Sequence, residues 1–377
     1  MKILLVSSQD YIHHPVPSRH HNIFEDIALR HDVHVAHFHV SRAVPRPTRL
    51  TVEEATLFPL QRPLLHYTFN TPYHYYIFDR ILKTGEFDLV VAAHVLAGTA
   101  VIHAAGKQNV PVVFDLKDWF PDSAAAYFTN RILQETVRKS VWAITKRNLS
   151  LVDKITTVSP SLVEKLRGFG FSADLITNGV DTDFFRPMDG SVARSELGIG
   201  ADDFVIGFCG SVERWYAIDE MIRALPTLIR HRPDTRLLVV GGSLFTDYLH
   251  ELQVLARELR VADHVIFTGT KPYHDLPKYI ASMDVCTIPL SPPRWGDIAL
   301  PNKFFEYSAC GKPILMRPMP DVERIGGPNL FVYRTREEYI EQVKHLMTHP
   351  ATFSINLERN SWKEKARQFE ELFQSLL

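Results

Sequence analysis

The sequence predicts an α/β protein of two domains, each built on a parallel sheet that helices cover on both faces. The chain has 377 residues, more than a single hydrophobic core usually supports. Short β-branched runs alternate with amphipathic stretches, a pattern typical of buried parallel sheets. The alternation pauses at "LITNGVDTDFFRP" (175–187), which contains an Asn-Gly turn, and then begins again.

The elements expected in each half follow from these runs. In the first half we expect strands at 2–8, 32–40, 87–94, 110–116 and 154–160, with helices that include 20–29 and 98–108. In the second half we expect strands at 203–211, 235–242, 263–270, 284–290 and 312–317, with helices at 217–231, 247–260, 275–282 and 302–310. We therefore place a first domain at 1–180, a second at 181–355, and a final amphipathic helix within 356–377.

Composition narrows the class of protein. The apolar fraction is 45%, the charged fraction is 23% and the net charge is −1, so a global electrostatic attraction to nucleic acid is excluded. The three cysteines form no Cys-x-x-Cys pair, which disfavours a zinc site or a disulfide framework. No apolar run approaches the ~18 residues of a membrane-spanning helix, and "MKILLVSSQD" predicts a strand rather than a signal peptide. We expect a cytoplasmic protein, with peripheral contact at the inner face of the membrane as an option.

The stretch "LPNKFFEYSACGKPI" (300–314) predicts a short helix that starts near Pro301 and stops at Gly311. Glu306 lies among apolar residues, where a carboxylate without a partner costs several kcal/mol. The helix start at Asn302 offers free N–H groups to an anion, and Lys303 in the first turn opposes the helix dipole unless an anion lies between them. A diphosphate at the helix start and a ribose on Glu306 would satisfy these groups. The alternative is a Glu306–Lys303 pair of i,i+3 spacing, worth a few tenths of a kcal/mol.

A second candidate loop follows the first strand of the second half. "GFCGSVERW" places Gly210 and Ser211 directly after that strand, where bare backbone can approach a phosphate, and Arg214 comes next in the loop. A tight turn with a solvated arginine is the alternative.

In the first half, polar groups follow three expected strands. His94 ends "DLVVAAH", Asp115 and Asp118 lie in "FDLKDWFPD" beside Trp119, and Arg19 lies in "HHPVPSRHHN". Trp119 could offer an aromatic face to a ligand and Arg19 could bind an anion. The alternatives are a structural histidine, a loop capped by Asp and Pro, and a surface arginine.

Two further patterns were interpreted as structural. His31, His34, His37 and His39 suggest a metal site, but side chains alternate along a strand, so they converge poorly. The stretch 131–149 mixes basic and apolar residues, which is compatible with a helix that lies on a membrane surface and also with a helix packed on its own sheet.

Taken together, "ALPNKFFEYSACGKPIL", "GSVERWYAIDEMIRALPTLIRHRPDTRLLVVGG", "ITNGVDTDFFRP" and "TTVSPSLVEKL" resemble the retaining GT-B glycosyltransferases of the GT4 family. The resemblance covers nearly the whole chain. It implies two facing Rossmann-like doubly wound domains with a cleft between them, the acceptor bound mainly by the first and the nucleotide-sugar donor by the second. It also implies that the final helix packs back on the first domain.

The resemblance implies roles for individual residues. Glu306 matches the second glutamate of the family's E-x7-E motif, which holds the donor ribose. Gly210 and Ser211 match the phosphate-facing loop, with Arg214, Asn302 and Lys303 adding to the diphosphate site. Thr270 and Lys271 match the base-contacting position. His94 and Asp118 are the candidate catalytic or positioning residues, and Arg19 and Trp119 are the candidates on the acceptor side.

The sequence departs from this family at the donor sugar. Ile298 replaces the first glutamate of the motif, so Asp297 or the backbone of Ala299 and Leu300 would contact the sugar, and Ser211 replaces the family's arginine. The resemblance implies no cofactor and no metal, because the nucleotide sugar is itself a substrate.

The function expected from the sequence is sugar transfer from a nucleotide sugar to a glycan, lipid-linked or small-molecule acceptor. Two alternatives stay open: a non-catalytic nucleotide-sugar binder or assembly subunit, and a GT-B epimerase or hydrolase. A dehydrogenase is disfavoured because neither domain's first strand is followed by G-x-G-x-x-G.

Overall fold

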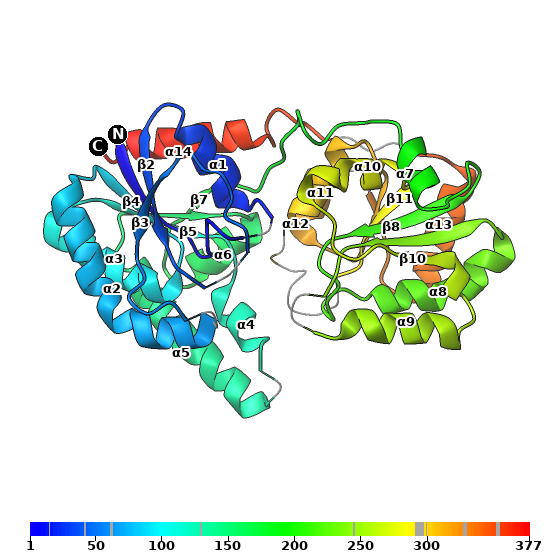
Figure 1. The fold of residues 1–377 in the computed structure, drawn as a ribbon, viewed down its shortest axis with the longest axis horizontal. Helices are drawn as coiled ribbons and strands as arrows, with labels where there is room; N and C mark the ends of the chain where they lie inside the picture. Colours follow the sequence, from blue (N-terminus) through cyan, green and yellow to red (C-terminus); the bar gives the residue numbers. More distant parts are fainter. Residues whose placement is uncertain are drawn as a thin grey trace. The chain divides into compact units, whose positions relative to one another are not determined.

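The computed structural model forms two compact units, each with its own parallel sheet (Figure 1). It describes residues 1–14, 16–40, 43–60, 63–128, 130–243, 246–290, 298, 300–326, 330–351 and 355–377. Unit 1 comprises Met1–Thr177 and Trp362–Leu377, and unit 2 comprises Asn178–Ser361. The predicted α/β class, with two Rossmann-like sheets, is confirmed. The cleft stays a prediction.

The sheet of unit 1 has seven parallel strands in the order β3-β2-β1-β4-β5-β6-β7. The strands are Lys2–Val6 (β1), Asp32–His37 (β2), Thr51–Glu54 (β3), Leu89–Ala92 (β4), Val112–Leu116 (β5), Lys154–Thr157 (β6) and Asp174–Leu175 (β7). The helices are Arg19–Ile27 (α1), Pro63–Gly85 (α2), Val95–Gln108 (α3), Phe120–Ala125 (α4), Arg131–Leu149 (α5), Pro160–Gly168 (α6) and Trp362–Gln374 (α14). Among them, β3, β7, α2, α4 and α6 were not predicted.

The last helix of the chain belongs to the first unit. Helix α14 packs beside α1, where Phe369 and Phe373 are fully buried against Phe24 and the strand residues Ile3 and Leu5. Ile3 and Leu5 alternate along β1 with Leu4 and Val6, and all four are buried, as expected for a strand covered on both faces.

The sheet of unit 2 has six parallel strands in the order β10-β9-β8-β11-β12-β13. The strands are Phe204–Cys209 (β8), Thr235–Val240 (β9), Val265–Phe267 (β10), Val285–Ile288 (β11), Ile314–Met316 (β12) and Leu330–Val332 (β13). The helices are Ser191–Glu196 (α7), Ile218–His231 (α8), Tyr248–Glu258 (α9), Leu276–Ala281 (α10), Asn302–Ala309 (α11), Pro320–Gly326 (α12) and Arg336–Thr348 (α13), with short 3-10 turns at Ala262–His264 and Tyr273–Asp275.

Two hydrophobic clusters lie on the two faces of this second sheet. Ile206 and Phe208 of β8 belong to the cluster that includes α8, α9 and α13. Val205 and Cys209 belong to the cluster that includes α10 and α11. The alternation along β8 therefore fixes which helices cover which face, and it places α11 directly on the sheet.

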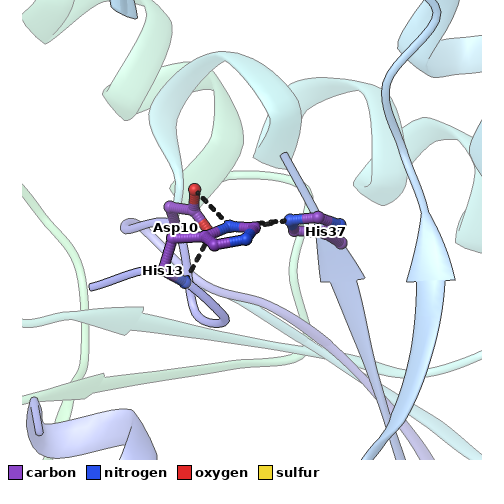
Figure 2. A group of neighbouring side chains, drawn as sticks. All are labelled: Asp10, His13 and His37. Atoms are coloured by element: carbon purple, nitrogen blue, oxygen red, sulfur yellow. Dashed lines mark hydrogen bonds and ion pairs between the residues drawn. The ribbon is translucent and has the colours of Figure 1, made fainter. Parts of the chain in front are cut away.

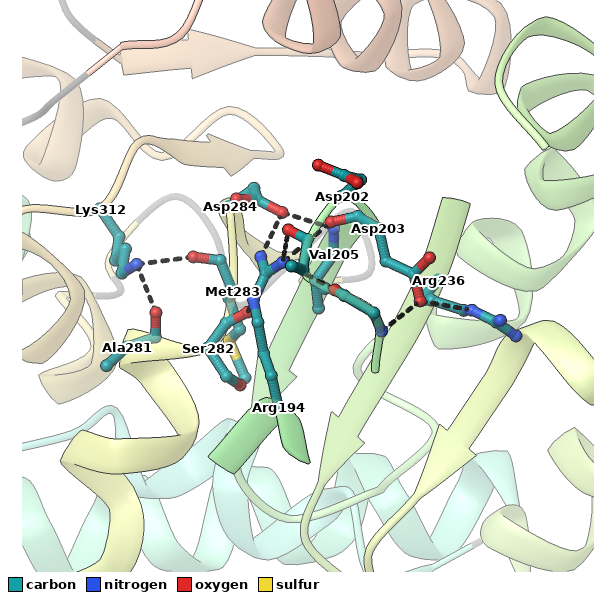
Figure 3. A network of polar contacts seen from close by, with 12 residues as sticks. Arg194, Asp202, Asp203, Val205, Arg236, Ala281, Ser282, Met283, Asp284 and Lys312 are labelled. Atoms are coloured by element: carbon teal, nitrogen blue, oxygen red, sulfur yellow. Dashed lines mark hydrogen bonds and ion pairs between the residues drawn. The ribbon is translucent and has the colours of Figure 1, made fainter. Parts of the chain in front are cut away.

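The amino ends of the unit 2 strands are held together by basic side chains, as Figure 3 shows. Arg194 donates to the carbonyls of Ser282 and Asp203 and to the Asp284 carboxylate, at 3.0, 3.0 and 2.7 Å. Lys312 donates to the Ala281 and Met283 carbonyls, both at 2.7 Å. A cavity of about 410 Å³ lies here. Since these cations are already paired and the ligands of open parallel sheets bind at the carboxyl ends, this cavity is not the candidate site.

A buried ion pair organises unit 1 around Asp115 of β5. Arg19 donates to Asp115 from Nε at 3.0 Å and from a terminal nitrogen at 3.4 Å, and its other terminal nitrogen donates to the Thr177 carbonyl at 2.8 Å. His20 and Thr156 contact the same carboxylate at 2.9 and 2.8 Å. Burial alone would raise the pKa of Asp115, but the charge of Arg19 and the contact with His20 outweigh it and hold the pKa below its usual range. Arg19 is thus a buried structural residue, and the expectation that it binds an anion is wrong.

Removing Arg19 should destabilise unit 1 strongly, because it leaves Asp115 charged and buried. We expect Arg19→Met to lower the free energy of unfolding by about 3–5 kcal/mol, measured by urea unfolding. The control is Arg30→Met, which removes a half-exposed arginine paired with Asp26 and Glu370 and should cost about 0–1 kcal/mol. Equal losses in the two variants would contradict the structural role of Arg19.

Candidate functional site

The candidate site of unit 2 lies at the carboxyl ends of β8, β9 and β10, where bare backbone segments meet. Gly210 follows β8 with a φ of 147°, and Gly241 follows β9 with a φ of 139°. A Cβ on Gly241 would lie 1.9 Å from the Gly210 carbonyl oxygen, so a side chain there is sterically excluded. The Gly241 N–H donates to the Gly269 carbonyl at 3.1 Å. Three strand ends therefore present glycine backbone at one edge.

Helix α11 brings Lys303 to this glycine backbone. A Cβ on Gly210 would lie 2.8 Å from the Lys303 ammonium. The ammonium lies 3.7 Å from the ring centre of Tyr216 and 4.4 Å from that of Phe208. Lys303 is 9% exposed, and its Nζ has no hydrogen-bond partner within the described residues. A buried ammonium held only by aromatic rings is poised for an anion.

Aromatic side chains anchor α11 so that Lys303 keeps this place. Phe304, Phe305 and Tyr307 are fully buried. The Tyr307 hydroxyl accepts from the Cys209 N–H at 2.9 Å and so joins the helix to the end of β8. Asn302 begins the helix, and its buried side-chain oxygen also has no partner among the described residues.

Glu306 lies one turn after Lys303 and does not pair with it. In the part of the chain that the structure describes, its carboxylate forms neither an ion pair nor a hydrogen bond, although it keeps partial exposure. The expected alternative, an i,i+3 pair with Lys303, is therefore not formed. Burial raises the pKa of Glu306 to about 7, against the opposing effect of the Lys303 charge. The carboxylate is free to accept hydrogen bonds from a ligand.

Of the other residues predicted to contact the nucleotide-sugar donor, the structure describes only some. Thr270 is exposed beside Gly242, with its hydroxyl oxygen 2.7 Å from where a Cβ on Gly242 would lie, and the Lys271 ammonium lies 5.7 Å from the Tyr279 ring centre. Leu300 is buried, and its carbonyl accepts from the Asn178 side chain at 2.8 Å. Asp297 and Ala299 lie outside the described residues.

Arg214, which was expected to add to the diphosphate site with Lys303, makes its contacts with residues of α9 instead. Its guanidinium pairs with Glu251 of α9, lies over the Tyr248 ring and is 58% exposed. This is the solvated arginine that the sequence left as an alternative. Ser211 follows Gly210 in the same loop, and its role at a diphosphate stays a prediction.

In unit 1, His94 is held in one tautomer at the start of α3. Its Nδ1 accepts from the Leu96 and Ala97 N–H groups, both at 3.1 Å, so the proton lies on Nε2. Burial, with a contribution from His74 and His66, lowers the pKa of His94 to about 3. His94 is therefore a neutral N–H donor.

Trp119 and Asp118 do not fit their expected roles. Trp119 is 6% exposed and packs against Trp142 and Phe169, with the Lys165 ammonium 3.9 Å from its ring centre, so its faces are not free for a sugar. Asp118 accepts from the Trp119 N–H at 2.7 Å and from the Ser123 hydroxyl, which is the capping role left open as an alternative.

Sequence reasoning missed Tyr216 and Phe208, the rings beneath Lys303. The glycines of "VVGG" and "FTGT" could have indicated the convergence of strand ends, because both lie at the carboxyl ends of predicted strands. No sequence signal pointed to the aromatic rings as a seat for an ammonium group.

Two family models match the chain. "Glycosyltransferase Family 4" matches residues 26–184, and "Glycosyl transferases group 1" matches residues 203–349. The chain belongs to the GT4-type glycosyltransferases. The family inferred from the sequence motifs is thereby confirmed.

Curated relatives match parts of the chain. Over 153 residues it is 41% identical to the "GDP-mannose-dependent alpha-(1-6)-phosphatidylinositol monomannoside mannosyltransferase" of Mycolicibacterium smegmatis, which covers 39% of each chain. Over 245 residues it is 28% identical to a "D-inositol 3-phosphate glycosyltransferase" of Stackebrandtia nassauensis, which covers 61% of this chain and 53% of that protein. The matches span well under two thirds of these relatives.

Solved structures match the fold over its whole length. Sucrose-phosphate synthase from Thermosynechococcus elongatus superposes with a TM-score of 0.80 at 18% identity, covering 100% of this chain and 98% of that one. Anabaena HepE in complex with UDP and glucose gives a TM-score of 0.76 at 20% identity and covers both chains completely. At these identities the likeness establishes the GT-B fold. None of the described helices is long and apolar enough to cross a membrane.

The raised pKa of Glu306 makes stability depend on pH. Its pKa is about 7 in the folded chain and 4.5 ordinarily, so the folded state binds the proton more tightly. Its contribution to stability is full below pH 4.5 and falls as the pH rises towards 7, by at most about 1.4 kcal/mol per pKa unit. We expect Glu306→Gln to gain stability relative to the wild type between pH 4.5 and 7, measured by urea unfolding at several pH values. A constant difference between the two proteins would contradict the raised pKa.

Proposed function

We propose that this protein transfers a sugar from a nucleotide-sugar donor to an acceptor hydroxyl, with retention at the anomeric carbon. The observation that carries the proposal is the unpaired, buried ammonium of Lys303 beside the bare backbone of Gly210. Glu306 stands without a partner one turn further along the same helix. A diphosphate joined to a ribose supplies the anion and the hydroxyls that these groups lack.

The proposed reaction breaks the bond between the anomeric carbon and the β-phosphate oxygen. Negative charge develops on the departing nucleoside diphosphate, and the fixed charge of Lys303 with the free N–H groups at Asn302 stabilises it. The acceptor oxygen forms the new bond to the anomeric carbon, and its proton passes to the departing phosphate or to solvent. No covalent intermediate on the protein is assigned.

Glu306 has a binding role in this scheme. When ionised it accepts hydrogen bonds from the two ribose hydroxyls, which are charge-assisted and therefore short and strong. Ser211 contributes to the diphosphate loop, and Thr270 and Lys271 are the candidates for the base. Arg214 would have to leave Glu251 to take part.

His94 has a positioning role in unit 1. Its Nε2–H can donate to an oxygen of the transferred sugar or the acceptor, and its low pKa keeps it uncharged at neutral pH. The acceptor is proposed to be a glycan, a lipid-linked glycan or a small polyol. The curated relatives named above, whose printed names specify inositol compounds, support a hydroxyl acceptor of this kind.

Membrane association is part of the proposal for a lipid-linked acceptor. Helix α5 carries Arg138 and Lys139, and at its start Ile132 and Leu133 are 80% and 43% exposed. Exposed apolar side chains beside basic ones favour an anionic lipid surface.

The alternatives from the sequence are less favoured, because the matching family models and curated relatives are described as transferases. A non-catalytic binder would bind the nucleotide without turnover. An epimerase or hydrolase would consume the nucleotide sugar without an acceptor.

The proposal is tested by calorimetric titration with UDP, GDP, ADP and TDP. We expect one base to bind best and Lys303→Met to weaken that binding by ~10–100-fold, the loss of a hydrogen bond to a charged group. The control is Lys344→Met on α13, where the lysine pairs with Glu341; it should bind as the wild type does. Absence of binding by all four nucleotides, or unchanged affinity in Lys303→Met, would overturn the proposal.

The role of His94 predicts a difference between two substitutions. His94→Gln retains an N–H donor and should keep more transferase activity than His94→Ala, which should lose about 10–1000-fold (a positioned polar contact is worth ~1.4–4 kcal/mol). The wild-type rate should show no titration of an imidazole near pH 6.5, since the pKa of His94 is about 3. Equal rates in the two variants would contradict the role of His94 as a hydrogen-bond donor.

A further inference from the structure

Three side chains that can ligate a metal converge in unit 1, and none of them has a role in the proposed function. Asp10 and His13 lie in the turn after β1, and His37 is the last residue of the parallel neighbour β2, so all three lie at the carboxyl edge (Figure 2). His13 Nδ1 is 3.3 Å from Asp10 Oδ2 and 3.3 Å from His37 Nε2. His37 Nε2 is 3.8 Å from Asp10 Oδ1.

The two separations from His13 Nδ1, both 3.3 Å, match the edges of a tetrahedral site. The 3.8 Å between His37 Nε2 and Asp10 Oδ1 is longer than such an edge and is measured to the second carboxylate oxygen. Ligand atoms about 2.0–2.1 Å from a zinc ion lie ~3.3–3.4 Å apart in a tetrahedron. An octahedral site with similar bond lengths has shorter edges, of ~3.0 Å. Two imidazoles and one carboxylate are also a ligand set found in zinc sites that keep one position open.

Glu54 orients His37 for this role. The parallel register of β2 and β3 places Glu54 opposite His37, and its Oε1 lies 2.9 Å from His37 Nδ1. A proton on Nδ1 that is donated to Glu54 leaves the Nε2 lone pair directed at Asp10 and His13. Carboxylate support of this kind fixes the tautomer of most metal-binding histidines.

Burial makes the cluster costly without an added cation. Asp10 and His37 are 6% and 4% exposed, and the side chain of His13 is 13% exposed. Among the residues that the structure describes, the ion partners of Asp10 are these two imidazoles alone. Without an ion, a single proton on His13 Nδ1 would be shared between Asp10 and His37.

A neighbouring group competes for the same ion. His37, His39 and Glu54 also bring their ligand atoms within 4.8 Å of one another. The side chains of His39 and Glu54 are 43% and 56% exposed, however, and Glu54 already binds both imidazoles. The more buried group, Asp10 with His13 and His37, is the better site.

We propose that Asp10, His13 and His37 bind a divalent ion of the zinc class, leaving one position for water or a ligand oxygen. The inference goes beyond the proposed function and does not depend on it, because the donor groups all lie in unit 2. It also revises the sequence interpretation of the histidines. His31 and His34 contact other groups, Glu370 and Glu53, at 3.1 and 2.7 Å. His37, by contrast, contacts Asp10 and His13 in the turn after β1 in addition to Glu54.

The test uses the full chain, stripped with a chelator, dialysed and titrated with ZnCl₂ alone against a chromophoric zinc chelator. We expect one zinc ion per chain, and a loss of affinity exceeding the ~10–100-fold typical of an orienting partner when a ligand is removed in His13→Ala or Asp10→Asn. Glu54→Gln should lose about 10–100-fold. Co²⁺ in place of zinc should give the intense visible bands of a tetrahedral site.

Two controls keep the result interpretable. His39→Ala should bind zinc as the wild type does, and His13→Ala should keep the wild-type circular dichroism and nucleotide affinity, which shows that the chain is folded. Failure to bind zinc stoichiometrically, or binding that survives His13→Ala, would overturn the proposal. A loss of zinc affinity in His39→Ala but not in His13→Ala would also overturn it, because the ion would then be bound by His37, His39 and Glu54.

Discussion

The seating of α11 on the sheet of unit 2 is the constraint on which the donor site depends. Phe304, Phe305 and Tyr307 fill the cluster on one face of that sheet, and the Tyr307 hydroxyl joins the helix to the end of β8. With the helix fixed in this way, Lys303 can only lie over Phe208 and Tyr216, beside Gly210. Core packing, rather than a counter-ion, holds the charge in place. An ammonium held like this needs little rearrangement when an anion arrives, which is the physical basis of electrostatic preorganisation.

The buried charge at the centre of unit 1 is paired with other side chains, unlike the Lys303 ammonium of unit 2. Asp115 is compensated by Arg19 and His20. Buried groups that are fully paired stabilise a fold and are poor candidates for chemistry. Lys303 and Glu306, by contrast, have no hydrogen-bond or ion-pair partner among the described residues. That difference separates the structural interpretation of Arg19 from the functional interpretation of Lys303, although both are buried cations near a strand end.

The two sheets and the α11 motif could be predicted from sequence because hydrophobic alternation and glycine or proline at element ends are local signals. Strand β3 was not predicted because "TVEE" is an exposed edge strand with little apolar character. Arg19 and Trp119 were wrongly assigned because their partners, Asp115 and Phe169, are 96 and 50 positions away in the chain. The cluster of Asp10, His13 and His37 escaped for the same reason: a parallel register brings strand ends together that sequence spacing keeps apart.

The measurement that tests the central claim most directly is a crystal structure of the chain with the nucleoside diphosphate that binds best. The account predicts a phosphate oxygen within about 3.2 Å of Lys303 Nζ, close to the Gly210 backbone, with the ribose hydroxyls on the Glu306 carboxylate. A nucleotide bound elsewhere, or one that leaves the Lys303 ammonium against its aromatic rings without a phosphate contact, would contradict it.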